Sequence, residues 1–220
     1  MSLAAATSPS LPAGPTVLVP VGSIEQHGPH LPLDTDTVIA SAVATRAAEE
    51  LGPSVLVAPA LSYGSSGEHQ DFAGTSSIGT DALHQVVVEL TRSMRTWAAR
   101  VVLVNGHGGN LTALRAAVEQ LVAEGHDVSW VACATEDVDL HAGRTETSLM
   151  LHLAPATVRL DRAEAGNTGS LAELLPLMLA GGVKAVSPNG VLGDPAGATA
   201  AEGAAVLAAM TVDVVRAVRR

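Results

Sequence analysis

The fold is decided by residues 16–61, which read TVLVPVGSIEQHGPHLPLDTDTVIASAVATRAAEELGPSVLVAPAL. This segment begins with the β-branched run TVLVPV and passes through a polar loop. It then takes on an amphipathic pattern of helical period from Thr37 to Leu51, and ends with the apolar run VLVAPAL. A strand, a helix and a strand in this order predict a βαβ unit, in which the two strands are parallel.

The same alternation continues along the chain. A helical pattern from Asp81 to Ala99 leads to the apolar run VVLVNG, and another from Leu111 to Glu124 leads to VSWVACA. Right-handed crossovers place helices on both faces of a parallel sheet. We therefore predict an α/β fold, namely a three-layer α/β/α sandwich with a mostly parallel central sheet.

After Ala134 the pattern becomes less regular. A loop with the sequence HAGRTETS precedes a short helical run from Thr147 to Leu153 and a Leu-rich stretch around 171–179. A final helix is expected at about Thr199 to Val218, and we expect it to pack onto the sheet. Its approach, SPNGVLGDPAGATAAEG, contains too many Pro and Gly residues for regular structure before the helix begins.

The chain has 220 residues, a length that predicts one domain. Residues 1–15, MSLAAATSPSLPAGP, show no periodicity and are predicted to be a flexible N-terminal tail or a short arm onto a neighbouring subunit. Residues 16–220 are then a single domain. With 47% hydrophobic and 15% charged residues, the chain can bury a sizeable core.

The composition excludes several classes of function. A net charge of −10 opposes binding to nucleic acid, and the four aromatic residues are too few for a base-stacking module. The same charge disfavours acidic membrane surfaces. No run of 18 apolar residues and no export signal is present, so we expect no membrane span. The single Cys133 cannot form an internal disulfide, which favours a reducing, cytoplasmic location.

Polar residues collect in the loops that follow the predicted strands. Five of the eight histidines fall there, and the other three fall on predicted helices or their ends: His27, His30, His69, His107 and His141 against His84, His126 and His152. Ligands of open α/β sheets bind beyond the carboxyl ends of the strands. The loops 22–36, 63–77, 105–110 and 139–148 are therefore the candidate site.

The first and third of these loops carry a pattern typical of metal ligands. Glu25 and His27 are two residues apart in an extended segment, so both side chains can point into one site. His and carboxylate ligands together suit zinc, iron or manganese. A carboxylate such as Asp36 can bridge two ions. His107 lies between two glycines, which allow close approach of the backbone to a ligand.

Each candidate also has a purely structural interpretation. Asp34 and Thr35 are better read as caps of the following helix, whereas Asp36 is either a cap or a ligand. An isolated NGHGGN is a weak signal, because Gly-rich turns between strand and helix are common. His30 is expected to shape its loop or to support a ligand from behind.

The sequence leaves the roles of further residues in these loops open. Glu68 and His69 either line the substrate pocket or are simply solvated. Arg144 either forms an ion pair within its loop or contacts a substrate carbonyl or carboxylate group. Cys133 is expected to fill space in a buried strand.

GSIEQHGPHLPLDTD, NGHGGN and HAGRTETSLML occur in this order, and through them the chain resembles the creatininase family over essentially 16–220. The resemblance implies two divalent metal ions per subunit, bound by Glu25, His27, Asp36 and His107, with Asp36 as the bridge. It also implies that His141 is the catalytic acid and base. For the oxyanion we expect backbone N–H groups of Gly108 or Gly109 as donors.

The sequence departs from creatininase itself at two places. Creatininase has a Glu two residues after its third-loop His, where this chain has Gly109. We expect Glu146 to replace that missing ligand, or else to support the ligands from outside. Creatininase also closes its site with a lid that carries a Trp, whereas the corresponding stretch here, EDVDLHAG at 136–143, has none. Creatinine is therefore a poor candidate substrate.

Three stretches, SYGSSGEH, HAGRTETSLMLHL and SPNGVLGDPAGATAAEG, are similar to the mycofactocin-system peptidases within the family. This resemblance implies a cytoplasmic homo-oligomer that cleaves a modified ribosomal precursor peptide. The cleavage releases the C-terminal Val-Tyr-derived portion during biosynthesis of a redox cofactor. The alternatives are a small-molecule amidohydrolase of the creatinine or formamide type, and a noncatalytic scaffold. The sequence leaves open which metal is physiological and how many subunits assemble.

Overall fold

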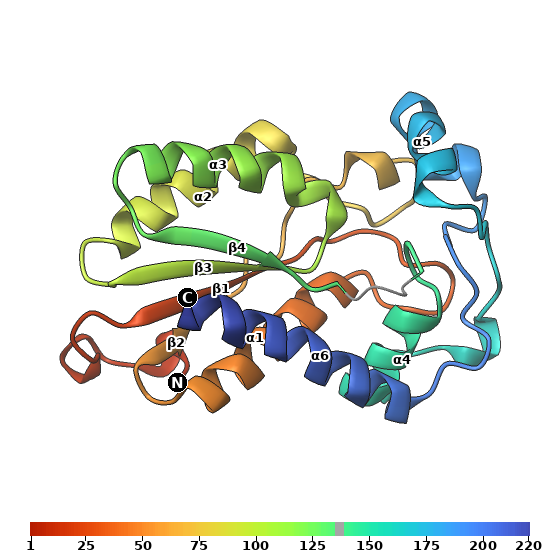
Figure 1. Cartoon of the computed structure of the whole chain (residues 1–220). Coiled ribbons are helices and arrows are strands. Elements are labelled where there is room, and N and C mark those ends of the chain that lie inside the picture. Colours follow the sequence, from red (N-terminus) through yellow and green to blue (C-terminus); the bar gives the residue numbers. More distant parts are fainter. Residues whose placement is uncertain (135–138) are drawn as a thin grey trace.

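The computed structural model describes residues 1–134 and 139–220 and contains a parallel sheet with the strand order β2, β1, β3, β4 (Figure 1). The strands are β1 (Thr16–Val21), β2 (Val55–Val57), β3 (Arg100–Asn105) and β4 (Val128–Ala132). In the central pairing, Thr16 lies opposite Val55 on one side and Arg100 on the other. The predicted parallel sheet is confirmed.

Helices cover both faces of this sheet (Figure 1). On one face lie α2 (Thr80–Met94) and α3 (Leu111–Ala123), and on the other lie α1 (Thr35–Leu51), α4 (Arg144–Leu153) and α6 (Ala200–Arg219). The three-layer sandwich is therefore confirmed. The sheet is covered on both faces because its strands are apolar on both faces. In β1, Val17 and Val19 join the core under α2 and α3, while Leu18 joins the core under α1 and α6.

Two predicted elements end several residues earlier in the structure than in the sequence pattern. The apolar run VLVAPAL contributes only Val55–Val57 to the ladder, because Pro59 has no N–H to donate. Leu61 rejoins the sheet when its N–H donates to the Pro20 carbonyl over 2.9 Å. The helix predicted to reach Ala99 ends at Met94, where Trp97 and Ala98 fold back to donate to the Met94 carbonyl.

The Leu-rich stretch forms α5 (Leu171–Val186), which lies apart from the sheet at the upper right of Figure 1. Ser170 and Glu173 form a capping box at its start, and the helix is bent at Gly182, which has a φ of 72°. Because Gly has no Cβ, it accepts this left-handed conformation without strain.

The stretch 1–15 lies against the edge of the sheet at its start. The Val57 N–H donates to the Met1 carbonyl over 2.9 Å, and Leu3–Ala5 and Ser8–Ser10 form 3-10 turns. The first residues thus cover part of the free edge of β2, where unpaired backbone groups would otherwise face water. The assignment of 16–220 as one domain stays a prediction.

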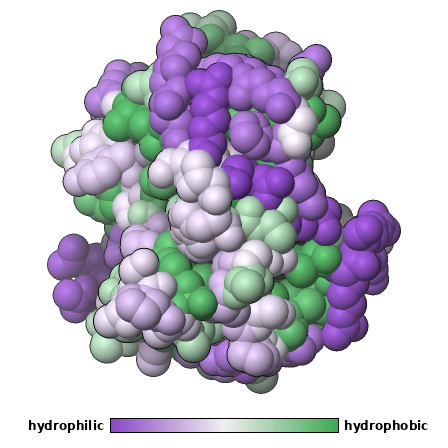
Figure 2. Space-filling view, turned by 90° about the vertical axis from the view of Figure 1, so that its left-hand side faces the viewer, coloured by the Kyte–Doolittle hydropathy of each residue, from purple (hydrophilic) through white to green (hydrophobic). Residues whose placement is uncertain are grey.

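All four strands run from left to right in Figure 1, so their carboxyl ends and the polar loops lie on the right-hand side. Figure 2 shows the opposite side, where hydrophilic and hydrophobic residues are interspersed and hydrophilic residues gather over α2 and α3. Within the described parts of the chain, no helix is long and apolar enough to cross a bilayer.

Candidate active site

The loops after the strands enclose a cavity of about 650 Å³ at the carboxyl edge of the sheet. Its lining includes most of the residues singled out in the sequence, namely Asp36, Glu68, His69, His107, Gly108, Gly109, His141 and Glu146. Glu25 and His27 are completely buried and contact these lining residues. The structure therefore brings together the predicted site residues from all four loops. The exception is Arg144, whose side chain is 52% exposed and pairs with Glu202 at 2.9 Å.

One group of buried side chains joins Glu25, Asp36 and His107. The His107 Nδ1 atom lies 3.2 Å from Glu25 Oε2 and 3.5 Å from Asp36 Oδ2. The Ser23 hydroxyl lies 2.7 Å from one oxygen of each carboxylate. Since a hydroxyl has one proton to donate, Ser23 satisfies one carboxylate at a time, and the pair of carboxylates keeps spare acceptor capacity.

A second group forms around His27 on the other side of Asp36. The His27 Nε2 atom lies 3.1 Å from Asp36 Oδ1 and 3.9 Å from Glu146 Oε2. Its Nδ1 atom lies 3.2 Å from the Glu25 carbonyl oxygen, which orients the ring. The two oxygens of Asp36 therefore face two different histidines, His27 and His107.

His69 and His141 both line the cavity and lie next to Glu25. The His69 Nε2 atom lies 3.4 Å from Glu25 Oε1, and the His141 Nδ1 atom lies 3.6 Å from the same oxygen. The Gln26 side chain connects the far sides of both rings, since its Nε2 atom lies 2.8 Å from His69 Nδ1 and 3.1 Å from His141 Nε2. The His141 Nε2 atom donates to the Gln26 carbonyl over 2.7 Å, which leaves Nδ1 of a neutral ring free to accept.

The loop of His141 is held by a segment far away in the sequence. His141 and Leu192 exchange two backbone hydrogen bonds, of 3.1 and 2.8 Å. The next residue, Ala142, has a φ of 52°, a left-handed conformation rare outside Gly. Its N–H donates to Glu146 Oε2 over 2.6 Å and so holds that carboxylate next to His27.

The structure also explains why position 109 is a glycine. A Cβ at Gly109 would overlap the Ser65 carbonyl and the His107 ring, and would lie 2.5 Å from Glu68 Oε1. Glu68 reaches the free side of His107, with 3.3 Å between its Oε1 atom and His107 Nε2. A carboxylate at position 109 is thus sterically excluded here. Besides Glu25 and Asp36, Glu68 lies next to His107 and Glu146 lies next to His27.

The pKa values of the histidines divide into two sets. Burial lowers the pKa of His27, but the Asp36 carboxylate outweighs it and raises that pKa to about 10. Burial also opposes protonation of His107, and the Glu25 carboxylate raises its pKa well above the usual value. In contrast, burial lowers the pKa of His141, and the nearby His27 lowers it further. Burial likewise lowers the pKa of His69, and the nearby His141 lowers it further.

The residues present fit divalent metal ions. Three sets of side chains each bring their ligand atoms within 4.8 Å of one another: Glu25, His69 and His141; His27, His141 and Glu146; and Glu25, His27 and Asp36. Among the described residues, the buried Glu25 Oε1 atom has no hydrogen-bond partner. A fully buried carboxylate oxygen without a donor is costly, and a cation would satisfy it.

The structure also shows the surroundings of the residues for which the sequence predicted a structural role. Neither Asp34 nor Thr35 forms a side-chain cap, since the Thr35 hydroxyl donates to the Pro32 carbonyl instead, over 2.8 Å. His30 is buried outside the cavity lining, and its Nε2 atom lies 2.8 Å from the Thr147 hydroxyl. Cys133 lines the cavity, and burial raises the pKa of its thiol to about 12, so it is an inert wall residue. The stretch 136–143 corresponds to the lid of creatininase, and its first three residues, 136–138, lie outside the described residues.

Three residues of the site were not predicted from the sequence, namely Ser23, Gln26 and Asn110. Asn110 joins three loops, because its amide donates to the Gly22 carbonyl over 3.0 Å and accepts from the Ser65 N–H over 2.8 Å. Their positions in the sequence could have indicated them, because Ser23 and Gln26 lie close to Glu25 and Asn110 is the last residue of NGHGGN.

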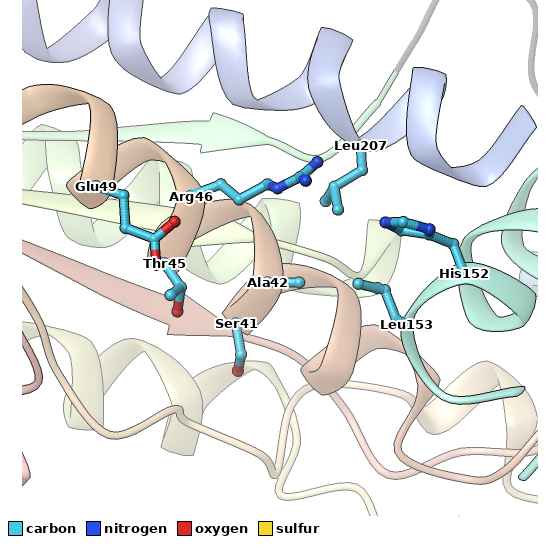
Figure 3. A pocket seen from close by; sticks show the side chains of 8 residues that line it. All are labelled: Ser41, Ala42, Thr45, Arg46, Glu49, His152, Leu153 and Leu207. Atoms are coloured by element: carbon cyan, nitrogen blue, oxygen red, sulfur yellow. The ribbon is translucent and has the colours of Figure 1, made fainter. Parts of the chain in front are cut away.

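A second cavity, of about 400 Å³, lies between α1, α4 and α6 (Figure 3). In Figure 3, Arg46, His152 and Leu207 approach one another over the short side chain of Ala42. Glu49 is the only carboxylate among its lining residues, and none of them belongs to the cluster described above. This cavity therefore lacks a set of metal ligands.

Fold and site together define a class, that of α/β proteins with a buried His and carboxylate site at the carboxyl edge of a parallel sheet. A sequence model described as "Creatininase: Creatinine amidohydrolase" matches residues 4–218. The chain therefore belongs to the creatininase family, whose members are hydrolases of amide and peptide bonds, as the sequence resemblance predicted.

Named relatives agree with this assignment. The chain is 56% identical to the mycofactocin precursor peptide peptidase of Mycobacterium tuberculosis (strain H37Rv), over 99% of this chain and 90% of that protein. It is 35% identical to the creatinine amidohydrolase of Pseudomonas putida, over 68% of this chain and 69% of that protein. Among solved structures, a mutant creatininase of Zn-Zn type superimposes with a TM-score of 0.76 at 27% identity, covering 93% of this chain and 90% of that one.

Proposed function

We propose that this chain is a metal-dependent peptidase that cleaves the modified mycofactocin precursor peptide and releases its C-terminal Val-Tyr-derived portion. The observation that carries the proposal is the 54–57% identity to proteins named mycofactocin precursor peptide peptidase, over 89–99% of this chain. The intact set of buried His and carboxylate side chains argues against a noncatalytic scaffold, because so many desolvated ionisable groups cost stability unless they are used.

We assign two divalent ions to the site, held by Glu25, His27, Asp36, His107 and Glu146. Support for Asp36 as the bridge is that its Oδ1 atom faces His27 and its Oδ2 atom faces His107. Support for Glu146 is its place 3.9 Å from His27 and the lack of room for a side chain at Gly109. When bound, such ions supply an activated water and electrophilic stabilisation for hydrolysis of an amide. Iron, zinc and manganese all suit this ligand set.

The other residues of the chain handle protons and charge around the scissile amide. His141 lines the cavity and donates through Nε2 to the Gln26 carbonyl, so its ring is fixed while Nδ1, 3.6 Å from Glu25 Oε1, can accept a proton and pass it on. Since its pKa is lowered, His141 is neutral and able to accept a proton before it protonates the leaving amine. Gly108 and Gly109 line the cavity just before α3, where backbone N–H groups can stabilise an oxyanion.

The remaining walls position the substrate. Glu68 and His69 line the cavity from the second loop and complete its polar side. Arg144 is assigned a structural role, because it pairs with Glu202 and does not line the cavity. We also propose a cytoplasmic homo-oligomer, for which exposed apolar side chains such as Leu160 and Val212 offer contact surface.

The test is mass spectrometry of the modified precursor peptide after incubation with protein loaded separately with iron, zinc or manganese, beside a metal-free control. We expect metal-dependent appearance of the leader peptide and the small C-terminal product. Absence of cleavage by protein shown to contain metal would overturn the peptidase assignment and favour a small-molecule amide as substrate.

A further inference from the structure

The helix α5 leaves an unusual amount of apolar surface uncovered. Leu171, Leu175, Leu177 and Leu179 are 50%, 42%, 57% and 80% exposed. Soluble proteins rarely leave several neighbouring leucines in water unless a ligand or a partner covers them.

The exposed residues of α5 fall into two sets. Leu171, Leu175, Met178 and Leu179 line the same cavity as the His and carboxylate cluster, whereas Leu177 does not. Positions i, i+4, i+7 and i+8 form one stripe of a helix. Leu177 lies about 240° around the helix from Leu171, at roughly 100° per residue, and therefore on another side. We call the four lining residues the α5 stripe.

The α5 stripe is held firmly next to the cluster. Leu174 and Val183 anchor the helix in a small core that also contains Leu192, the residue that pairs with His141. At Gly182 the backbone approaches the loop so closely that a Cβ would lie 3.0 Å from the Glu68 carbonyl. Lys184 Nζ donates to the Asp71 carbonyl over 3.1 Å. The stripe thus faces the cluster across the cavity.

We propose that the α5 stripe binds an apolar, ring-sized group of the substrate directly beside the scissile amide. This inference rests on the proposed function and adds the residues that select the substrate. The cavity of about 650 Å³ lies in the range of sites that enclose a small organic ligand. One wall is polar and reactive, and the wall formed by α5 is aliphatic. Met178 adds a flexible thioether, which adapts to ring edges.

The first test compares Leu175→Ser and Leu179→Ser with the matched control Leu177→Ser, using the metal-loaded enzyme and the modified precursor peptide. One apolar methylene in a hydrophobic pocket changes kcat/KM by roughly 10- to 200-fold. We therefore expect each stripe variant to lose about 10-fold or more in kcat/KM. The control should keep a kcat/KM close to that of the wild type. Equal losses in all three variants, or none, would overturn the proposal.

The second test does not depend on activity. Ligand-observed NMR measures binding of N-benzylacetamide and of acetamide to the same four proteins. We expect the wild type and Leu177→Ser to bind the benzyl compound better than acetamide, and the stripe variants to lose this preference. If the wild type fails to cleave the precursor but shows this preference, the proposed function is wrong and the inference stands. Cleavage without the preference would overturn the inference alone.

Size-exclusion chromatography with light scattering tests the other possibility, namely that a second copy of the chain covers α5. That possibility predicts that Leu177→Ser and Leu179→Ser both dissociate the assembly, and such a result would overturn our proposal. An unchanged assembly in all variants supports it.

Discussion

Asp36 is the residue on which the proposed metal centre depends most. Its two carboxylate oxygens face His27 and His107, and it is 2% exposed. We expect Asp36→Ala to lose bound metal and activity together, because no other carboxylate in the described structure lies within 4.0 Å of both histidines. Metal analysis of the purified variant, beside Asp34→Ala as a control at the start of the same helix, checks this. Full metal content and rate in Asp36→Ala would show that the bridge is assigned to the wrong residue.

His141 tests the separation of proton transfer from metal binding. We expect His141→Ala to reduce turnover by roughly 10²- to 10⁴-fold, as for loss of a general acid or base, with metal content unchanged. Steady-state kinetics and metal analysis provide both readouts, and His84→Ala on α2, outside the cavity, is the control. Loss of metal from His141→Ala would instead show that this residue is a ligand. His141 belongs to two of the three sets of side chains that could hold a metal ion.

At the scale of elements, the contact between α4 and α6 positions Glu146. The helices cross at Gly203, where a Cβ would overlap the Ser148 carbonyl, so α6 can lie against α4 only with glycine at this position. We expect Gly203→Ala to lower the free energy of unfolding by about 1–3 kcal/mol, because overpacking forces helices apart. It should also weaken metal binding, since α4 carries Glu146.

The measurements for Gly203→Ala are urea unfolding and a metal titration. Ala209→Ser, at an exposed position of the same helix, is the control and should stay within about 0.5 kcal/mol of the wild type. A Gly203→Ala variant that is as stable as this control would mean that the two helices can separate at little cost.

For the whole molecule, the proposed metal centre ties together the segments that follow β1, β3 and β4, so metal should stabilise the entire fold. A ligand present at 1,000 times its dissociation constant adds about 4 kcal/mol to the stability of the folded state. We expect the midpoint of thermal unfolding to rise when metal replaces a chelator in the wild type, and to stay constant in Asp36→Ala. The same rise in both proteins would place the stabilising ion elsewhere.

The alternation of short β-branched runs with amphipathic segments determined the parallel sheet and its helices, because strand and helix periods are local properties of the chain. Local position also placed Glu25, His27, Asp36, His107 and His141 at strand ends, where parallel strands bring loops together. Only the tertiary structure decided how these side chains are held. The contacts of Gln26 with His69 and His141, the pairing of His141 with Leu192, the crowding at Gly109 and the approach of α5 to the cavity all join residues distant in sequence. Such contacts depend on how whole elements pack, and no local periodicity encodes them.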